Sequence, residues 1–286
     1  MRYNFKKILG VVGNPVLHSL SPLFQNYIIE RLKLDYVYVP FEVETAHFRS
    51  FIKGAEVVKN LVGLNITIPF KEEAYKYCDI LSDASKEIKV VNTIYFKDGK
   101  KYGYNTDIWG VINVIKEMLK ITDLKAKTSI VLGGGGGARA AIYGIKRLGG
   151  EKIYVVLKSK KREAELINWA KSSLNLDIII IDWGEINRIF KIESVHLLIN
   201  ATPLGIQGEN LPIDFKYIQG YCKIFDMAYS KNETPFVREA LSNHIDAVDG
   251  IYMLIYQGVE SFKIWTGETI DVNEIIDYLK RQLRNG

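Results

Sequence analysis

The chain has 286 residues, more than a single domain usually holds, so its length favours two domains. Hydrophobic residues make up 48% and charged residues 25%, as in an ordinary globular protein, and the net charge of +5 is scattered rather than gathered into the basic run of a nucleic-acid-binding protein. No segment resembles a signal peptide or approaches the length of a membrane span, so we expect a soluble, cytoplasmic protein.

The first third of the chain alternates strand and helix patterns, which is typical of a mostly parallel sheet. Short apolar runs predict the strands, while Ser21-Pro22 predicts a helix start with Ser21 as the N-cap. Strands are expected at 8–13, 36–41 and 61–67, helices at 21–32 and 45–58, and a hairpin at the sheet edge over 92–104.

The rest of the chain predicts a second series of alternating strands and helices, followed by two helices over 251–284. Helices are expected at 107–120 and 138–148, and strands at 129–132, 152–157, 177–181, 195–200 and 223–227. We place the domain junction on the helix that begins at residue 107. The fold class is therefore α/β, with one domain over 1–107 and a second over 108–250.

A glycine-rich turn lies between the strand and the helix that open the second series. It reads G-x-G-G-x-A from residue 133, and it contains Gly133, Gly134, Gly135, Gly136 and Gly137. Such a turn lets the backbone approach a pyrophosphate, and the following helix offers free N–H groups to it. A run of glycines is also compatible with a flexible surface loop, but its position between a strand and a helix favours a Rossmann-like nucleotide site.

The end of the next strand bears on the choice of cofactor. An NAD-binding domain usually has an acidic residue there, whereas this chain has Lys158, Ser159, Lys160, Lys161 and Arg162. Cations at this place favour the 2′-phosphate of NADP; the alternative is that they are solvated residues at the start of a helix. Cys78 and Cys222 form no disulfide framework, and no cluster of ligand residues indicates a metal, so we expect neither.

Three polar clusters in the first domain are expected at strand ends or in the loops that follow, where open α/β sheets bind their ligands. They are 18–21, 65–71, and 92–93 with 105–107. Taken singly, each has a structural alternative: Ser21 and Asp107 could cap helices, Lys71 could be a surface lysine, and Asn92 could be a turn residue.

Sequence segments along nearly the whole chain share one pattern. They are GNPVLHSLSP (13–22), GLNITIPFK (63–71), VNT (91–93), GYNTDIWG (103–110), LGGGGGARA (132–140), INATPLG (199–205), DMAY (226–229), GIYMLIYQG (250–258) and WTG (265–267). In this order and spacing they resemble the shikimate and quinate dehydrogenases. The resemblance implies a substrate domain with the C-terminal helices, about 251–286, packed back on it, and an NADP-binding domain.

The resemblance also implies a role for each matching residue. Lys71 and Asp107 would be the catalytic pair, Lys71 relaying the proton of the reacting hydroxyl and Asp107 orienting both; which of the two is formally the base stays open. Residues expected to contact the substrate are Ser19, Ser21, Thr67, Asn92, Tyr229 and Gln257. Residues expected to contact the cofactor are Gly133 to Gly137, Lys158, Lys160, Met227 and Gly250.

The implied reaction is the reversible NADP-dependent reduction of 3-dehydroshikimate to shikimate, in aromatic amino acid biosynthesis. Two alternatives stay open: a quinate/shikimate dehydrogenase that uses both NAD and NADP, and a non-catalytic ligand sensor on the same fold. Lysine in place of the family's usual arginine at position 158 weakens the expected NADP preference. The expected partner is the small substrate, with no nucleic acid or membrane, and a homodimer is the alternative to a monomer.

Overall fold

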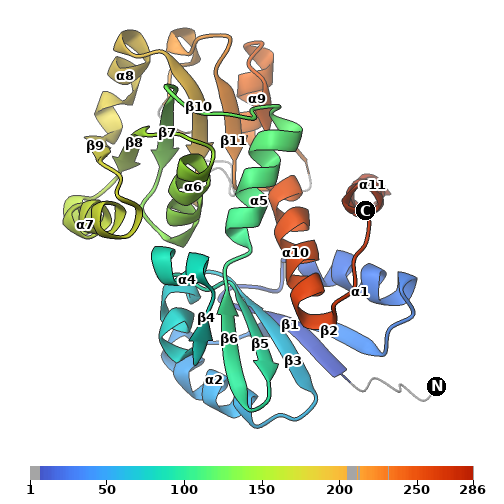
Figure 1. The fold of residues 1–286 in the computed structure, drawn as a ribbon. Coiled ribbons are helices and arrows are strands. Elements are labelled where there is room, and N and C mark those ends of the chain that lie inside the picture. The colour runs from blue at the N-terminus through green and yellow to red at the C-terminus, as the bar shows by residue number, and fades with distance from the viewer. Residues whose placement is uncertain (1–6, 205–210, 212, 231, 286) are drawn as a thin grey trace. The chain divides into compact units, whose positions relative to one another are not determined.

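The computed structural model describes residues 7–204, 211, 213–230 and 232–285, apart from the side chains of Lys160 and Asn285 (Figure 1). The chain forms two compact units, one of residues 1–106 with 255–286 and the other of residues 107–254. These boundaries lie one residue before and four residues after those expected from the sequence. Ile251 to Leu254 group with the second unit, where the N–H of Gly250 donates to Ala228 O at 2.9 Å.

The first unit contains one six-stranded sheet with the order β2-β1-β3-β5-β6-β4. Its strands are β1 (Lys7–Gly13), β2 (Tyr36–Glu42), β3 (Leu61–Ile66), β4 (Ile80–Leu81), β5 (Thr93–Lys97) and β6 (Lys100–Tyr104). Its helices are α1 (Ser21–Arg31), α2 (Phe48–Glu56), α3 (Lys71–Ala74), α4 (Asp83–Ile88) and α11 (Val272–Asn285), with the part of α10 (Ile251–Thr266) that follows Leu254. The 3-10 turns are η1 (Thr45–His47) and η2 (Tyr75–Tyr77). The hairpin is not at the sheet edge as predicted, because the two-residue strand β4 pairs with the outer side of β6.

Both faces of this sheet are covered. Phe48 and Ile52 of α2 pack with Leu64 and Ile94 in one apolar core. Trp265 of α10, from the C-terminal part of the sequence, donates its Nε1–H to Ile94 O at 2.9 Å. Figure 1 shows α10 beside the N-terminal strands. Helix α11 packs on α1, where the rings of Tyr27 and Tyr278 are stacked with centroids 3.8 Å apart.

The strand directions explain how distant polar residues reach one sheet edge. Strands β1, β2 and β3 are parallel, β5 runs antiparallel to β3, and β6 runs antiparallel to β5. The carboxyl ends of β1, β3 and β6 therefore lie at the same edge as the amino end of β5. Asn92 precedes β5, so it reaches this edge through the reversed strand and not, as predicted for its cluster, by following a strand.

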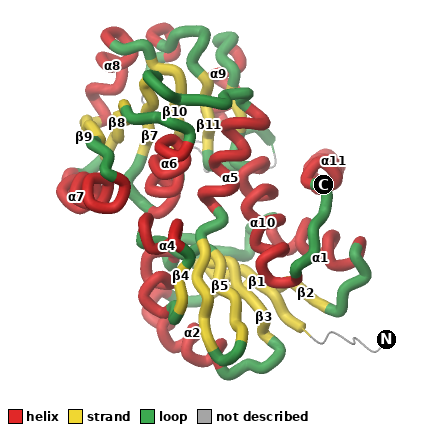
Figure 2. The backbone as a smooth tube through the Cα atoms, in the orientation of Figure 1, coloured by secondary structure: helices red, strands yellow, loops and turns green. Residues whose placement is uncertain are grey.

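The second unit contains a six-stranded sheet with the order β12-β11-β10-β7-β8-β9, in which every pairing is parallel. Figure 2 shows strands of this sheet in yellow, with helices in red beside them. Its strands are β7 (Thr128–Leu132), β8 (Lys152–Leu157), β9 (Ile178–Asp182), β10 (Val195–Asn200), β11 (Lys223–Asp226) and β12 (Ala247–Val248). Its helices are α5 (Asp107–Asn113), α6 (Gly136–Arg147), α7 (Glu163–Leu174), α8 (Ile186–Ile192) and α9 (Pro235–Ser242). Short helical segments are the π-helical η3 (Val114–Met118) and the 3-10 turns η4 (Lys160–Arg162), η5 (Trp183–Glu185) and η6 (Phe215–Tyr217).

Two predicted helices differ from those observed. The helix expected over 107–120 is α-helical only to Asn113 and then becomes π-helical. The helix expected from Ala138 begins at Gly136, so only Gly133 to Gly135 form the turn. Helices α8 and α9 cover one sheet face, where Phe190 and Phe236 join the core with Ile130 of β7. Among the described residues no helix is both long and apolar enough to cross a membrane.

Candidate active site

The loop after β1 contains Ser19 and leads directly into Ser21 at the start of α1. The Ser19 N–H donates to Val16 O at 2.9 Å, and the Ser19 Oγ accepts from the Ser21 N–H at 3.2 Å. Leu20 is the N-cap of α1 and makes no side-chain cap bond, so the predicted N-cap role of Ser21 is wrong. Ser21 is instead the first residue of the helix, with only 4% of its surface exposed.

The loop after β3 lies directly against this serine loop. The Thr67 N–H donates to Val12 O at 2.8 Å, and the Asn14 N–H donates to Ile68 O at 3.0 Å. A side chain at Gly13 would collide with the Thr67 methyl group, so glycine permits the close approach of the two loops. The hydroxyls of Ser19, Ser21 and Thr67 therefore come from two loops whose backbones are hydrogen-bonded together.

Lys71 and Asn92 are joined through the backbone beside them. Lys71 is half-buried and begins α3, and its carbonyl oxygen accepts from the Val91 N–H at 3.0 Å. Asn92 follows Val91 and has 2% of its surface exposed. Two predicted site residues that are distant in sequence are thus held near each other at the same sheet edge by a backbone hydrogen bond between Lys71 and the residue before Asn92.

The amide of Asn92 has a fixed orientation. Its Oδ1 accepts from the Thr106 backbone N–H at 2.7 Å, a group that can only donate, so the other amide atom must be the NH2. That NH2 group donates to Thr106 Oγ1 at 3.0 Å and to Gln257 Oε1 at 3.4 Å. Asn92 therefore links the segment after β6 to α10 and orients the amide of Gln257. Asn92 and Gln257 are both predicted substrate contacts.

A second buried amide, which sequence reasoning did not select, supports this group. The Asn65 Oδ1 accepts from the Tyr38 hydroxyl at 2.8 Å, which leaves its NH2 to donate to Thr93 Oγ1 at 3.1 Å and Ser261 Oγ at 2.9 Å. Ser261 in turn donates to the Gln257 carbonyl oxygen at 2.9 Å. A signal for Ser261 was available, because it lies one helical turn after Gln257 in a predicted helix.

Asp107 begins α5 and is buried, with 3% of its surface exposed. It is grouped with the second unit, directly after the last residue of the first. The backbone N–H of Thr106 is the group that Asn92 accepts from, so the backbone leading into Asp107 is held by the first unit.

The glycine turn has the features that a pyrophosphate site requires. Gly133 has a φ of +106°, which disfavours any side chain, and a Cβ there would lie 3.1 Å from Thr202 Cγ2. A Cβ at Gly135 would meet nothing within 4 Å, so the backbone is open there. Gly135 is also the N-cap of the 12-residue helix α6 and provides no side-chain cap, which leaves the first N–H groups without a side-chain acceptor.

Two further segments adjoin the glycine turn within the second unit. A Cβ at Gly137 would lie 3.3 Å from Met227 Cε and 3.9 Å from Ala201 Cβ. A Cβ at Gly250 would collide with the backbone of Met227, so this predicted cofactor residue permits a close backbone approach. The glycine turn, the loop at Ala201, and Met227 with Gly250 therefore form one surface after β7, β10 and β11, and these residues fit a dinucleotide.

Behind this surface lies a buried carboxylate, Asp226, with no exposed area. Burial raises the pKa of Asp226 to about 6, although hydrogen bonds from Thr234, the Ala228 N–H and Asn200 act in the opposite direction. Its shifted pKa alone would make it a candidate catalytic acid. Asp226 is completely buried and accepts three hydrogen bonds. Its geometry therefore indicates that it supports the surface in front of it and does not itself contact a ligand.

The expected ribose-phosphate residues follow β8. Lys158 is exposed, whereas the side chain of Lys160 lies outside the described part of the structure. Arg162 Nε lies 3.4 Å from Glu165 Oε2, and Glu165 also forms an ion pair with the buried Arg139. The Glu165 carboxylate therefore offsets part of the positive charge of the cationic cluster at residues 158–162.

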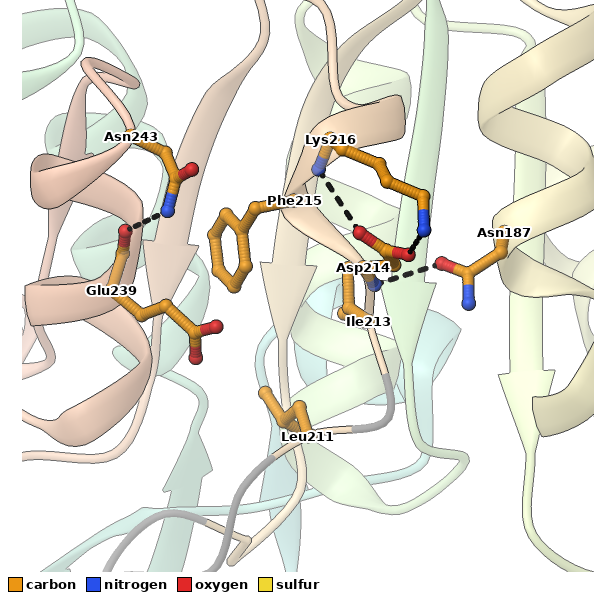
Figure 3. A pocket seen from close by; sticks show the side chains of 8 residues that line it. All are labelled: Asn187, Leu211, Ile213, Asp214, Phe215, Lys216, Glu239 and Asn243. Carbon is orange, nitrogen blue, oxygen red and sulfur yellow. Dashed lines mark hydrogen bonds and ion pairs between the residues drawn. The ribbon is translucent and has the colours of Figure 1, made fainter.

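Other features lie apart from this edge. A surface pocket of about 510 Å³ in the second unit (Figure 3) is lined by Asn187, Leu211, Ile213, Asp214, Phe215, Lys216, Glu239 and Asn243. No predicted site residue lines it. Within the described ranges, no group of three His, Cys, Asp or Glu residues could hold a metal ion. Cys78 and Cys222 are free thiols, and burial raises the pKa of each to about 12.

Comparisons with known proteins identify the family. Residues 11–94 match the model of the shikimate dehydrogenase substrate binding domain, and residues 250–278 match that of the shikimate 5'-dehydrogenase C-terminal domain. A relative named shikimate dehydrogenase (NADP(+)), from Methanobrevibacter smithii, is 37% identical over 281 residues, which cover 97% of each chain. The chain belongs to the shikimate dehydrogenase family.

Solved structures of shikimate dehydrogenases share the whole fold. One, in complex with NADP+, superposes with a TM-score of 0.87 at 30% identity, over 97% of this chain and 96% of that one. Another, from Listeria monocytogenes in complex with shikimate and NAD, has a TM-score of 0.84 at 28% identity over 96% of each chain. The α/β fold class and the family predicted from the sequence are confirmed.

Proposed function

We propose that this chain is an NADP-dependent shikimate dehydrogenase, which reversibly reduces 3-dehydroshikimate to shikimate in aromatic amino acid biosynthesis. The observation that carries the proposal is the convergence of the loops bearing Ser19, Thr67, Lys71 and Asn92 at one sheet edge of the first unit. The first unit acts as the substrate domain and the second as the NADP domain. The enzyme works in the cytoplasm, with a homodimer as its assembly.

The substrate has a carboxylate and several hydroxyls, and the site offers matching groups. Ser19 and Ser21 hold the carboxylate, together with Tyr229 of the second unit. Asn92 presents an amide whose orientation is fixed, and Gln257 is oriented by its hydrogen bond to that amide. These two amides and Thr67 contact the ring hydroxyls. Fixed donors and acceptors favour a substrate that can satisfy them over an analogue that leaves one unpaired.

Lys71 and Asp107 handle the proton. Oxidation of an alcohol to a ketone requires removal of a proton from oxygen, and bound NADP supplies the acceptor for the hydride. Lys71 relays the proton from the reacting hydroxyl, and Asp107 orients Lys71 and that hydroxyl. The backbone hydrogen bonds of Lys71 and of Thr106, the residue before Asp107, restrict the backbone positions from which the Lys71 and Asp107 side chains extend.

Gly133, Gly134, Gly135, Gly136 and Gly137 hold the pyrophosphate, Met227 and Gly250 border the nicotinamide, and Lys158 and Lys160 meet the 2′-phosphate. Position 158 has a lysine, which binds phosphate as a point charge without the paired hydrogen bonds of arginine. Glu165 offsets part of the nearby cationic charge. We therefore expect a preference for NADP over NAD that is weaker than an arginine would give.

The test is a matrix of four assays: kcat/KM for shikimate and for quinate, each with NADP and with NAD. The proposal predicts the highest value for shikimate with NADP. A higher value for quinate or for NAD would favour the dual-specificity alternative. Stoichiometric binding of shikimate and NADP without turnover would favour the ligand-sensor alternative.

A further inference from the structure

Asp226 lies at the centre of a buried polar network in the second unit. Its Oδ1 accepts from Asn200 Nδ2 at 2.8 Å and from the Ala228 N–H at 3.1 Å, and its Oδ2 accepts from Thr234 Oγ1 at 2.6 Å. Asn200, Asp226 and Thr234 each have no exposed area. A buried carboxylate is tolerated only where donors compensate for its lost hydration, and three donors converge here.

Sheet register brings two members of the network together. Asn200 ends β10, Asp226 ends β11, and the two are directly paired across these parallel strands. The Met227 N–H also donates to Asn200 O at 2.9 Å. The side-chain and backbone bonds together fasten the two strand ends at the point where each chain leaves the sheet.

Asn200 also shapes the loop that follows it. Its Oδ1 accepts from the Thr202 N–H at 3.1 Å and the Thr202 hydroxyl at 2.6 Å, and its Nδ2 also donates to Leu204 O at 3.1 Å. The Thr202 methyl and Ala201 O are the groups that a Cβ at Gly133 would approach, at 3.1 and 3.2 Å. The loop that Asn200 shapes is therefore packed directly against the glycine turn.

Asp226 also holds the segment that contains Met227 and Ala228. The Ala228 N–H that donates to Asp226 belongs to the same residue whose carbonyl oxygen accepts from the Gly250 N–H at 2.9 Å. Thr234, the third donor, is the N-cap of α9, where its Oγ1 accepts from the Val237 N–H at 3.3 Å. One carboxylate thus connects the loop after β10, the segment after β11 and the start of α9.

We propose that Asp226 is a positioning residue for the cofactor: through Asn200 and Ala228 it fixes the Ala201 loop and Met227, the two segments that adjoin the glycine turn and would hold the dinucleotide. It touches neither substrate nor cofactor, because it is buried behind these residues. The proposal rests on the proposed function, since Met227 borders a nicotinamide only if the chain binds one.

The primary test compares Asp226→Ala with the wild-type enzyme by calorimetric titration of NADP and by steady-state kinetics. Removing the carboxylate leaves three buried donors without an acceptor, so we expect the Kd for NADP to rise about tenfold and kcat to fall about tenfold. The KM for shikimate should rise less than the Kd for NADP, because most of the proposed substrate contacts belong to the first unit and only Tyr229, next to Ala228, lies in the disturbed segment. Shikimate deuterated at the reacting carbon should give a larger isotope effect on kcat than in the wild type, because misplaced carbons make hydride transfer slower.

Two further variants keep the test decisive if Asp226→Ala fails to fold. Thr234→Val removes one donor at a similar side-chain volume, and it should raise the Kd for NADP about threefold, while Thr234→Ser, which retains the hydroxyl, should restore it. Ser82→Ala removes the N-cap of α4 in the first unit and is the matched control for loss of a helix cap. It should lower the melting temperature without changing the Kd for NADP.

The inference is overturned if the Asp226 and Thr234 variants lose stability yet bind NADP and transfer hydride like the wild type, as Ser82→Ala should. That outcome would leave Asp226 a purely structural residue. Failure of the wild-type enzyme to oxidise shikimate with NADP is a separate result, and it would refute the proposed function instead.

Discussion

The buried carboxyl of Asp226 should make the stability of the second unit depend on pH. Its folded-state pKa of about 6 lies above the value of 3.8 for an unperturbed aspartate. The folded protein therefore binds more protons than the unfolded chain between these values, and stability falls as the pH rises through this window. The difference between these two pKa values corresponds to ~3 kcal/mol over the whole window. Roughly half of this, about 1 kcal/mol, is lost between roughly pH 5 and pH 7.5.

The assay is urea unfolding of the wild type and of Asp226→Asn at both pH values. Tryptophan fluorescence reports mainly on the second unit, which contains three of the four tryptophans, Trp109, Trp169 and Trp183. Asparagine can still accept from Asn200 and Ala228 through one oxygen, and its NH2 can donate to the Thr234 hydroxyl, so the fold should be retained.

The free energy of unfolding of the wild type, minus that of Asp226→Asn, should decrease by about 1 kcal/mol from the lower pH to the higher. Asp98→Asn, at an exposed hairpin turn, removes a carboxyl outside the network and is the matched control. A difference that rises with pH would refute the reasoning, because it would mean that the three donors outweigh burial and lower the pKa of Asp226.

Three further variants test the site. Lys71→Ala should lower kcat by about 10²- to 10⁴-fold while the Kd for shikimate changes much less, and a near-normal rate would remove Lys71 from proton transfer. Lys158→Ala should raise the KM for NADP roughly three- to fivefold and leave that for NAD unchanged, with Lys171→Ala on α7 as the control; equal effects on both cofactors would point to another phosphate contact. Gly250→Ala should raise the KM for NADP and lower the melting temperature, because its Cβ would collide with the backbone of Met227; unchanged values of both would contradict that close approach.

Local sequence signals predict the residues that lie in a recognisable motif of consecutive residues. The glycine turn follows an apolar strand and precedes a helix, so its place was readable from the chain. The same holds for the serine loop after β1 and for Lys71 after β3. The structure adds that Gly136 already belongs to α6, a boundary that glycine's low helix propensity obscured.

The residues that sequence reasoning missed depend on contacts between distant segments. The sequence predicts strands that end at Asn200 and at Met227, but the hydrogen bond between Asn200 and Asp226 depends on strand order and register, which local patterns do not encode. In the sequence Asn65 stands out only as part of a motif, and its burial beneath Asn92 comes from the antiparallel direction of β5. The π-helical turn after Asn113 likewise had no local signal.

The central claim is tested most directly by mixing the purified protein with shikimate and NADP and following the absorbance of reduced nicotinamide, with Lys71→Ala in parallel. The wild type should produce reduced cofactor and 3-dehydroshikimate in equal amounts, and Lys71→Ala should produce them at a rate at least about a hundredfold lower. No reduced cofactor from the folded wild-type protein, which still binds both ligands, would contradict the account.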